Sequence, residues 1–285
     1  MTDVEVPPAL AHALGTIGRN PPTGAPLPHQ LSRLAELDHV VMLVGPGVVV
    51  AGAVEGLRSF AEAANLGVAN TYGAKGVLRW DSPHHLGTCG LQRDDAELLG
   101  LGSADLVITS GLDPDESDAQ QYLLTQSVDI APEDLETFAS HTGRAPNPIA
   151  ETELYRRIAA IAVPGYTDDR EPRHPAAAVA GLRSAFPGAT VIAEPGLAGL
   201  WVARTYPTEE LGSVVVPCRG APGIAVALGR VTAGGGVPTV VVTTKATPQH
   251  SFPVVVWDDV DWSPTDELVA AAGPIVGING ARLSP

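Results

Sequence analysis

Short apolar runs alternate along this chain with segments of helical periodicity, and this alternation restricts the fold more than any other feature. Residues 40–44 are continuously apolar, as expected of a strand that is buried on both faces, and they end at Gly45-Pro46-Gly47. Residues 51–64 then carry apolar side chains at helical spacing. Further apolar runs follow at residues 67–70, 105–109 and 128–130. Strands that alternate with helices predict a parallel sheet with helices on both faces.

A second series of strands and helices follows a polar, proline-flanked stretch at residues 164–175. Across the chain we expect further helices at residues 29–37, 147–162, 177–186, 223–233 and 266–272, and further strands at residues 190–194, 214–217, 237–243, 254–257 and 274–277. The predicted fold class is α/β, with two three-layer domains whose sheets are mainly parallel. Their predicted bounds are residues 29–165 and 173–285. Residues 1–28 are rich in proline and glycine, and we expect an N-terminal arm or linker there.

The charge and the cysteine content exclude several classes of partner. The formal net charge is −15 at pH 7, and an acidic surface repels phosphate backbones and anionic lipids, so we expect neither nucleic acid nor a membrane as a partner. No apolar run reaches membrane-spanning length, and the N-terminal residues do not resemble a signal peptide. Cys89 and Cys218 lie far apart without metal-ligand spacing. We therefore predict a cytoplasmic protein with reduced thiols.

Four segments of the first domain carry a family resemblance when they are taken together. They are VGPGVVVAGA, NTYGAKGVL, HHLGTCGLQ and SADLVITSGLDPDE, in this order and spacing. They resemble the central domain of thiamine-diphosphate enzymes such as acetolactate synthase and benzoylformate decarboxylase. That resemblance implies a Rossmann-like domain, which in some members binds FAD or an ADP moiety and in many members binds nothing.

The loops after the strands of this domain supply the candidate cofactor-binding residues. Open parallel sheets place ligands at the carboxyl ends of their strands, and a glycine loop can admit a phosphate to a helix N-terminus. Glycine is also needed at such a loop for steric reasons alone, and Lys75 is either a phosphate ligand or a solvated turn residue. The candidates are Gly45, Gly47, Thr71, Lys75, Gly76, Gly90, Ser110 and Gly111. Their ligand would be FAD or an ADP-type nucleotide.

Other polar clusters are weaker candidates. His84 and His85 suit acid–base or metal chemistry but have no third ligand at motif spacing, so a loop role is favoured. The acidic residues at 113–116 lack the spacing of a calcium loop, and we expect them in a solvated loop. Cys218 has no histidine nearby in the sequence, and Glu194 alone at a strand end does not define a reaction.

The second half resembles the diphosphate-binding domain of the same family, but it departs from the family at the magnesium site. The matching stretches are ATVIAEPGLAGLWVART and CRGAPGIAVALGRV. The resemblance implies Gly-Asp-Gly after the strand at residues 237–243, where the aspartate and a later asparagine hold Mg²⁺. Thr243-Thr244-Lys245 stands in that place here, and Asp258-Asp259 stands near the position of the asparagine. We therefore assign no metal ligand and interpret this domain as degenerate.

The resemblance also implies a pyrimidine-binding domain with an activating glutamate, and we expect both to be absent from this chain. We therefore assign no catalytic residue, and we expect thiamine diphosphate and Mg²⁺ to bind only where a partner completes the site. The first hypothesis is a pseudoenzyme or partner-dependent homologue of the acetolactate synthase large subunit, with a binding or regulatory role. It would form a homo-oligomer, or a hetero-oligomer with a pyrimidine-domain chain. The alternatives are a subunit of a split 2-oxo acid decarboxylase or carboligase, and an FAD- or ADP-binding module.

Overall fold

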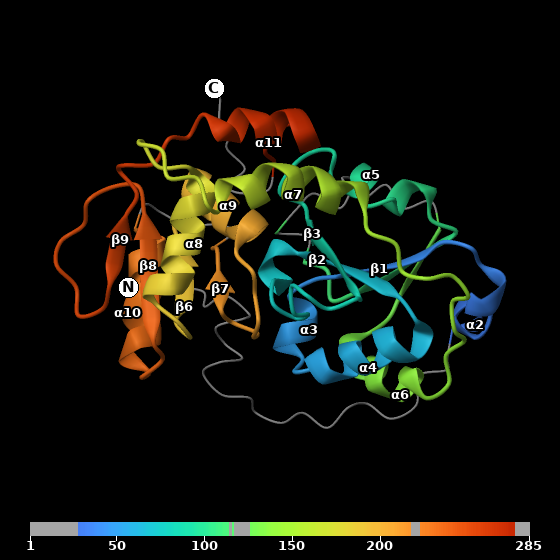
Figure 1. The fold of residues 1–285 in the computed structure, drawn as a ribbon. Helices are drawn as coiled ribbons and strands as arrows, with labels where there is room; N and C mark the ends of the chain where they lie inside the picture. Colours follow the sequence, from blue (N-terminus) through green and yellow to red (C-terminus); the bar gives the residue numbers. More distant parts are fainter. Residues whose placement is uncertain (1–27, 114–115, 117–125, 218–222, 277–285) are drawn as a thin grey trace.

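The computed structural model describes residues 28–113, 116, 126–217 and 223–276, which form two parallel β-sheets surrounded by helices (Figure 1). The first sheet has the strand order β3-β2-β1-β4-β5, and all of its pairings are parallel. Its strands are β1 (Val40–Val44), β2 (Gly67–Thr71), β3 (His85–Cys89), β4 (Leu106–Ser110) and β5 (Ser127–Asp129). The order reverses between β1 and β4, which is the point where open α/β sheets form a crevice.

The central strand β1 of the first sheet is buried on both faces, which explains why it is continuously apolar. Met42 and Val44 of β1 pack with Phe60 on one face, whereas Val41 and Leu43 belong to the apolar cluster on the other face. The first face is covered by α2 (His29–Ser32), α3 (Gly47–Val50), α4 (Val54–Ala64) and α6 (Leu135–Ala139) (Figure 1). The opposite face meets α5 (Asp95–Leu98) and α7 (Glu153–Gly165). Short 3-10 turns lie at η1 (Leu34–Glu36), η2 (Tyr72–Ala74), η3 (Leu101–Ser103) and η5 (Pro132–Asp134).

The second sheet has the strand order β7-β6-β8-β9, again with parallel pairings throughout. Its strands are β6 (Thr190–Ala193), β7 (Val214–Val215), β8 (Thr239–Thr243) and β9 (Val254–Val256). Ile192 and Val241 face α10 (Ile224–Gly234), while Val191 and Val240 face the other side. On that other side lie α8 (Pro175–Ala185), α9 (Leu197–Thr205) and α11 (Pro264–Ala272).

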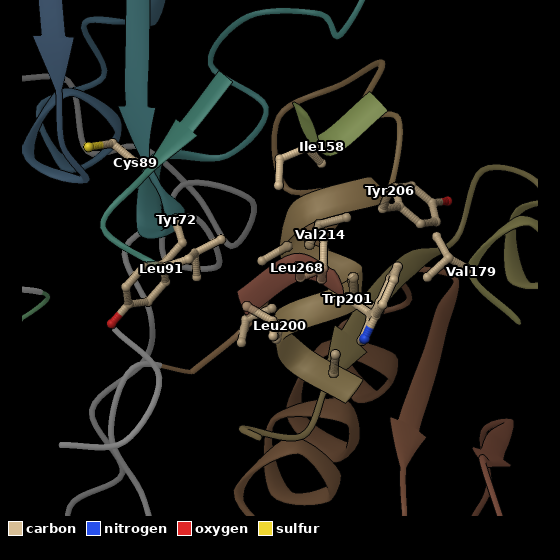
Figure 2. Close-up of a cluster of buried hydrophobic side chains, with 14 of the residues drawn as sticks. Tyr72, Cys89, Leu91, Ile158, Val179, Leu200, Trp201, Tyr206, Val214 and Leu268 are labelled. Atoms are coloured by element: carbon tan, nitrogen blue, oxygen red, sulfur yellow. The ribbon is translucent and has the colours of Figure 1, made fainter. Parts of the chain in front are cut away.

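One apolar cluster runs from the first sheet to the second. It includes Leu43 of β1 and Val242 of β8, so side chains from the facing sides of both sheets pack in the same core. Figure 2 shows Tyr72 and Leu91 from the first part of the chain in the same buried cluster as Trp201 from α9. Because buried apolar area is the main stabilising contribution in folding, this continuity holds the two sheets together as one packed unit.

The α/β fold class with mainly parallel sheets is confirmed. The boundary near residues 166–172 stays a prediction. Helix α7, which the sequence places at the end of the first domain, packs against α8 and α11 of the second sheet. Its Leu154 and Ile158 belong to the cluster that both sheets share.

Several elements differ from the sequence-based expectation, each for a local reason. Residues 87–89, for which no strand was predicted, belong to the edge strand β3, where a bulge opposite Val68 and Ala69 accommodates the positive φ of Gly87. The helix predicted from residue 147 begins at Glu153, because the Thr152 side chain caps it by accepting from the Tyr155 amide. Residues 274–276 form an isolated antiparallel bridge with Gln92 instead of a further strand.

The helix predicted over residues 51–64 is divided in two. Helix α3 ends at Val50 and α4 begins at Val54, because Gly52 between them takes a positive φ of 69°. Across the described ranges, none of the helices has the length and apolar character needed to cross a membrane.

A buried polar network joins three segments at the junction of the two sheets. The Arg204 guanidinium on α9 forms an ion pair with Asp95, and it donates to the Thr88 carbonyl at 2.7 Å and to Gln92 Oε1 at 3.2 Å. Asp95 also accepts from the Leu91 and Gln92 amides. The Gln92 side chain in turn donates to the carbonyls of Leu268 and Gly273, both at 2.8 Å.

The two charges of this network are almost fully buried. The side chains of Arg204 and Asp95 are 2% and 1% exposed. A buried ion pair is stabilising only while both partners and their hydrogen bonds are present, since each charge alone is costly in a low-dielectric interior. The network therefore ties α9, the β3–α5 connection and α11 to one another.

We predict that Arg204→Met lowers the free energy of unfolding by about 3–5 kcal/mol, because it leaves the Asp95 carboxylate buried without its counter-charge. The decrease in the free energy of unfolding of the double variant Arg204→Met, Asp95→Asn should be smaller than the sum of the decreases in the two single variants. Urea denaturation of the purified variants measures both effects. Arg33→Met, which removes the exposed pair with Glu36, is the control and should leave the midpoint nearly unchanged. An Arg204→Met variant as stable as the parent would contradict the assigned role of the pair.

Candidate functional site

The loops at the carboxyl ends of β1 and β4 bring four predicted residues together: Gly45, Gly47, Ser110 and Gly111. The Gly45 amide donates to the Ser110 carbonyl at 2.9 Å, and the Gly47 amide donates to the Gly111 carbonyl at 2.8 Å. A Cβ atom on Gly45 or Gly47 would collide with the backbone at Gly111, whose own φ is +61°. The glycines are therefore needed for two loops that touch backbone to backbone.

This contact leaves little at the crevice to hold a phosphate. A phosphate site at a helix N-terminus needs free amides, but the amides of Gly45 and Gly47 are already donated to carbonyls. The Ser110 hydroxyl is buried and has no hydrogen-bond partner within the described ranges. The assignment of these four residues to a nucleotide stays a prediction.

Thr71 forms a hydrogen bond with Glu116, an acidic residue that was expected in a solvated loop. The Thr71 hydroxyl donates to the Glu116 carboxylate. Glu116 was expected in a solvated loop, but it is 5% exposed, and burial raises its pKa to about 7. The expectation was wrong for Glu116 because the carboxylate finds donors in the η2 turn, where the Gly73 amide also bonds to it. Residues 114 and 115 of the same cluster lie outside the described ranges.

Lys75, Gly76 and Gly90 lie away from this crevice. Gly76, with a φ of +96°, packs against the backbone of Glu210, and a Cβ there would be 2.9 Å from the Glu210 carbonyl oxygen. Gly90 follows the edge strand β3 and also has a positive φ. The structure thus separates the predicted residues into a β1–β4 group and a group at the junction with the second sheet.

A cavity of about 400 Å³ lies at this junction, between the β3 side of the first sheet and helices α7, α8 and α9. Leu154, Ile158 and Ala162 form one stripe of α7 along its wall. Its polar lining includes Lys75 directly after η2, His85 from β3 and Arg204 from α9. A concave, mostly apolar space with a few convergent polar groups is the usual form of a small-molecule site.

Lys75 is the unusual group of this cavity. It is 6% exposed, and within the described ranges its amine has neither a hydrogen bond nor an ion pair. Burial, together with the nearby positive charge of Arg204, lowers the pKa of Lys75 to about 7. Two interpretations of Lys75 were open from the sequence, a phosphate ligand and a solvated turn residue, and the solvated interpretation is wrong.

His84 and His85 do not act as a pair. The Nδ1 atom of His84 bonds to the Leu66 carbonyl at 2.8 Å, whereas His85 lines the cavity. Burial first, and then the charge of Lys75, lower the pKa of His85 to about 4, so its ring is neutral at pH 7. The Nδ1 atom of His85 is buried, and no described residue forms a hydrogen bond with it.

The carboxyl edge of the second sheet does not fit a magnesium–diphosphate group. The Thr243 hydroxyl is closed into a turn, accepting from the Lys245 amide and donating to the Lys245 carbonyl, each at 3.2 Å. Half-buried Glu194 accepts from the Gly223 amide at 2.9 Å and adds negative charge near β6. Asp259 forms an exposed ion pair with Arg173. In the part of the chain that the structure describes, no group of three or more His, Cys, Asp or Glu residues is placed to hold a metal ion.

One polar residue of the cavity was not among the candidates from the sequence. Arg204 was missed, although an arginine within the apolar stretch LAGLWVART signals a buried partner. Cys218 lies outside the described residues, and Cys89 is a buried free thiol whose pKa is raised by burial.

We predict a stability contribution that depends on pH through Lys75. Its pKa is near 7 in the folded chain, against an ordinary value of 10.5, so the unfolded chain binds more protons between these values. Below pH 7 the buried ammonium of Lys75 lowers the free energy of unfolding by its full amount. Above pH 7 the amine loses its proton in the folded chain, and the free energy of unfolding rises by up to about 1.4 kcal/mol per pH unit. Urea denaturation between pH 6.5 and 9.5 should show this rise in the parent and in Lys245→Met, but not in Lys75→Met. An equal pH dependence of stability in the parent and both variants would contradict the assignment of this effect to Lys75.

The comparisons with known proteins agree with the topology. Residues 29–142 match the model of the thiamine pyrophosphate enzyme, central domain. No curated protein matches the chain. Among solved structures, the chain is similar to that of a "putative thiamin diphosphate-dependent enzyme isolated from Mycobacterium smegmatis", with a TM-score of 0.55 and 16% sequence identity over 80% of this chain.

That match covers 51% of the mycobacterial protein, so the chain spans about half of its length. At 16% identity the similarity shows the α/β fold alone. The family model covers β1 to α6, which is the complete first sheet with the helices on its outer face. Residues 29–142 of this chain are therefore a central domain of the thiamine pyrophosphate enzyme family.

Proposed function

We propose that this chain is a non-catalytic or partner-dependent member of the thiamine pyrophosphate enzyme family, with a binding or regulatory role in an assembly. The observation that carries the proposal is the closed Thr243–Lys245 turn at the end of β8. The family resemblance implies a magnesium-binding carboxylate at this place. Here the turn offers two hydroxyl groups and one exposed lysine.

The electrostatics of the same edge support the proposal. A diphosphate is strongly anionic, and the family relies on a divalent cation to compensate it. The carboxylate of Glu194 lies at this edge of the sheet, on the strand next to β8. The single positive charge of Lys245 is a weak substitute for a divalent cation, because the side chain is exposed and solvated. The family suggests thiamine diphosphate as cofactor, but the described residues do not fit it, so no catalytic step is assigned.

The resemblance also supports an assembly as the working state. It implies a cofactor site formed between domains of different subunits. A homo-oligomer, or a hetero-oligomer with a pyrimidine-domain chain, therefore remains our proposal for the partner. The FAD or ADP hypothesis gains no support from the comparisons, and the donated amides of Gly45 and Gly47 do not favour it.

We predict that the purified chain neither binds thiamine diphosphate with micromolar affinity in the presence of Mg²⁺ nor consumes pyruvate. The reason is the missing compensation for the diphosphate at the end of β8. Titration calorimetry and a pyruvate-consumption assay measure the two properties. An acetolactate synthase tested under the same conditions is the positive control. Micromolar binding or turnover by the chain alone would refute the proposed role.

A further inference from the structure

We propose that the cavity between the first sheet and helices α7 to α9 binds a small organic monocarboxylate. The carboxylate would meet Lys75, and an apolar body would lie along α7. This proposal concerns neither the thiamine diphosphate site nor the β1–β4 crevice, and it holds whether or not the chain is catalytic.

The charge of the cavity lining is the first argument. The sequence contains 32 Asp and Glu residues against 17 Lys and Arg residues, so an average surface of this chain is acidic. Among the described residues, the lining nevertheless contains the cations Lys75, Arg183 and Arg204 and the neutral ring of His85, but no Asp or Glu residue. Its other titratable groups are the tyrosines Tyr155, Tyr166 and Tyr206. A basic lining in an acidic chain favours an anionic ligand.

The second argument is the state of the donors inside the cavity. The guanidinium of Arg204 is paired with Asp95, and Arg183 is paired with Glu209 at the surface. The Lys75 amine is therefore the cationic group of the lining that lacks a partner among the described residues. An ammonium on a side chain that is only 6% exposed is costly without a partner, and a carboxylate oxygen would satisfy it. His85 Nδ1, also buried without a partner, adds a second polar atom to the lining.

Charge balance and size select the ligand class. Asp95 neutralises Arg204, and Glu209 neutralises Arg183, which leaves one uncompensated charge on Lys75. One ammonium suits one carboxylate, whereas a diphosphate would bring several negative charges. The volume of about 400 Å³ lies in the lower part of the range for small-molecule sites and is too small for a dinucleotide such as FAD.

The apolar wall and the mouth complete the site. Leu154, Ile158 and Ala162 follow one another at single-turn intervals along α7, so they present a continuous apolar stripe to the ligand body. Trp80 and Val163 also line the cavity and are 40% and 60% exposed. They therefore lie at its opening, where apolar side chains that face solvent cover an entering ligand.

The test uses 3-phenylpropanoate as the probe and 3-phenylpropan-1-ol as its neutral match, in titration calorimetry at pH 6.5. The parent chain should bind the carboxylate at least tenfold more tightly than the alcohol. Lys75→Met should lose at least tenfold in affinity for the carboxylate but retain its affinity for the alcohol, which shows that its cavity is intact. Lys245→Met, the matched control at an exposed lysine, should behave as the parent.

Two lysines in the whole sequence allow a direct localisation of the probe. Acetylation with a limiting amount of acetic anhydride at pH 7.5, followed by peptide mass spectrometry, reports on Lys75 and Lys245 in the same sample. The carboxylate should slow acetylation of Lys75 at least threefold and leave Lys245 unchanged. The proposal is overturned if the parent binds neither probe at millimolar concentration, if the alcohol binds as tightly as the carboxylate, or if Lys75 is not protected.

Discussion

The structure depends on the buried ion pair between Arg204 and Asp95, because it lies where the two sheets meet. The Asp95 carboxylate also accepts two backbone amides at the end of the β3–α5 connection, so its position is fixed from the side of the first sheet. Arg204 projects from α9 of the second sheet and reaches the carbonyl of Thr88 next to it. Apolar packing alone is non-directional, whereas this network requires one relative placement of the two sheets. We infer that it sets the register of the junction.

That placement creates the cavity and determines its charge. Arg204 directs Nε toward Gln92, Nη1 toward Thr88 and Nη2 toward Asp95, and its positive charge acts on Lys75 across the cavity. Lys75 experiences this charge as repulsion, which adds to the cost of its burial. A chain that needed only a stable junction would gain from an apolar residue at position 75, because an unpaired buried amine opposes folding. The retained amine therefore points to a ligand rather than to packing.

The sequence predicts the parts of the fold that local patterns encode. The apolar runs of β1 and β8 and the small-residue helix α10 were located to within a few residues, since buried parallel strands are continuously apolar. The edge strand β3 was not predicted because Gly87 interrupts its apolar pattern, although that glycine serves a bulge. The burial of Lys75 could not be predicted. It depends on α7 and α9, which are distant in sequence and close in space.

The carboxyl edges of both sheets, where α/β proteins usually bind ligands, are closed by internal contacts in this chain. At the first sheet the glycine loops bond to each other, and at the second sheet Thr243 bonds to its own turn. Polar groups that are satisfied internally gain little from a ligand, because binding would exchange one hydrogen bond for another. Lys75 and Nδ1 of His85, which have no hydrogen-bond partner among the described residues, lie instead at the junction between the sheets, whereas the Ser110 hydroxyl is the unpartnered group at the first crevice. A protein that had lost the cofactor chemistry of its relatives could still bind a ligand there, since that cavity forms where the two sheets pack together and uses neither the β1–β4 crevice nor the turn after β8.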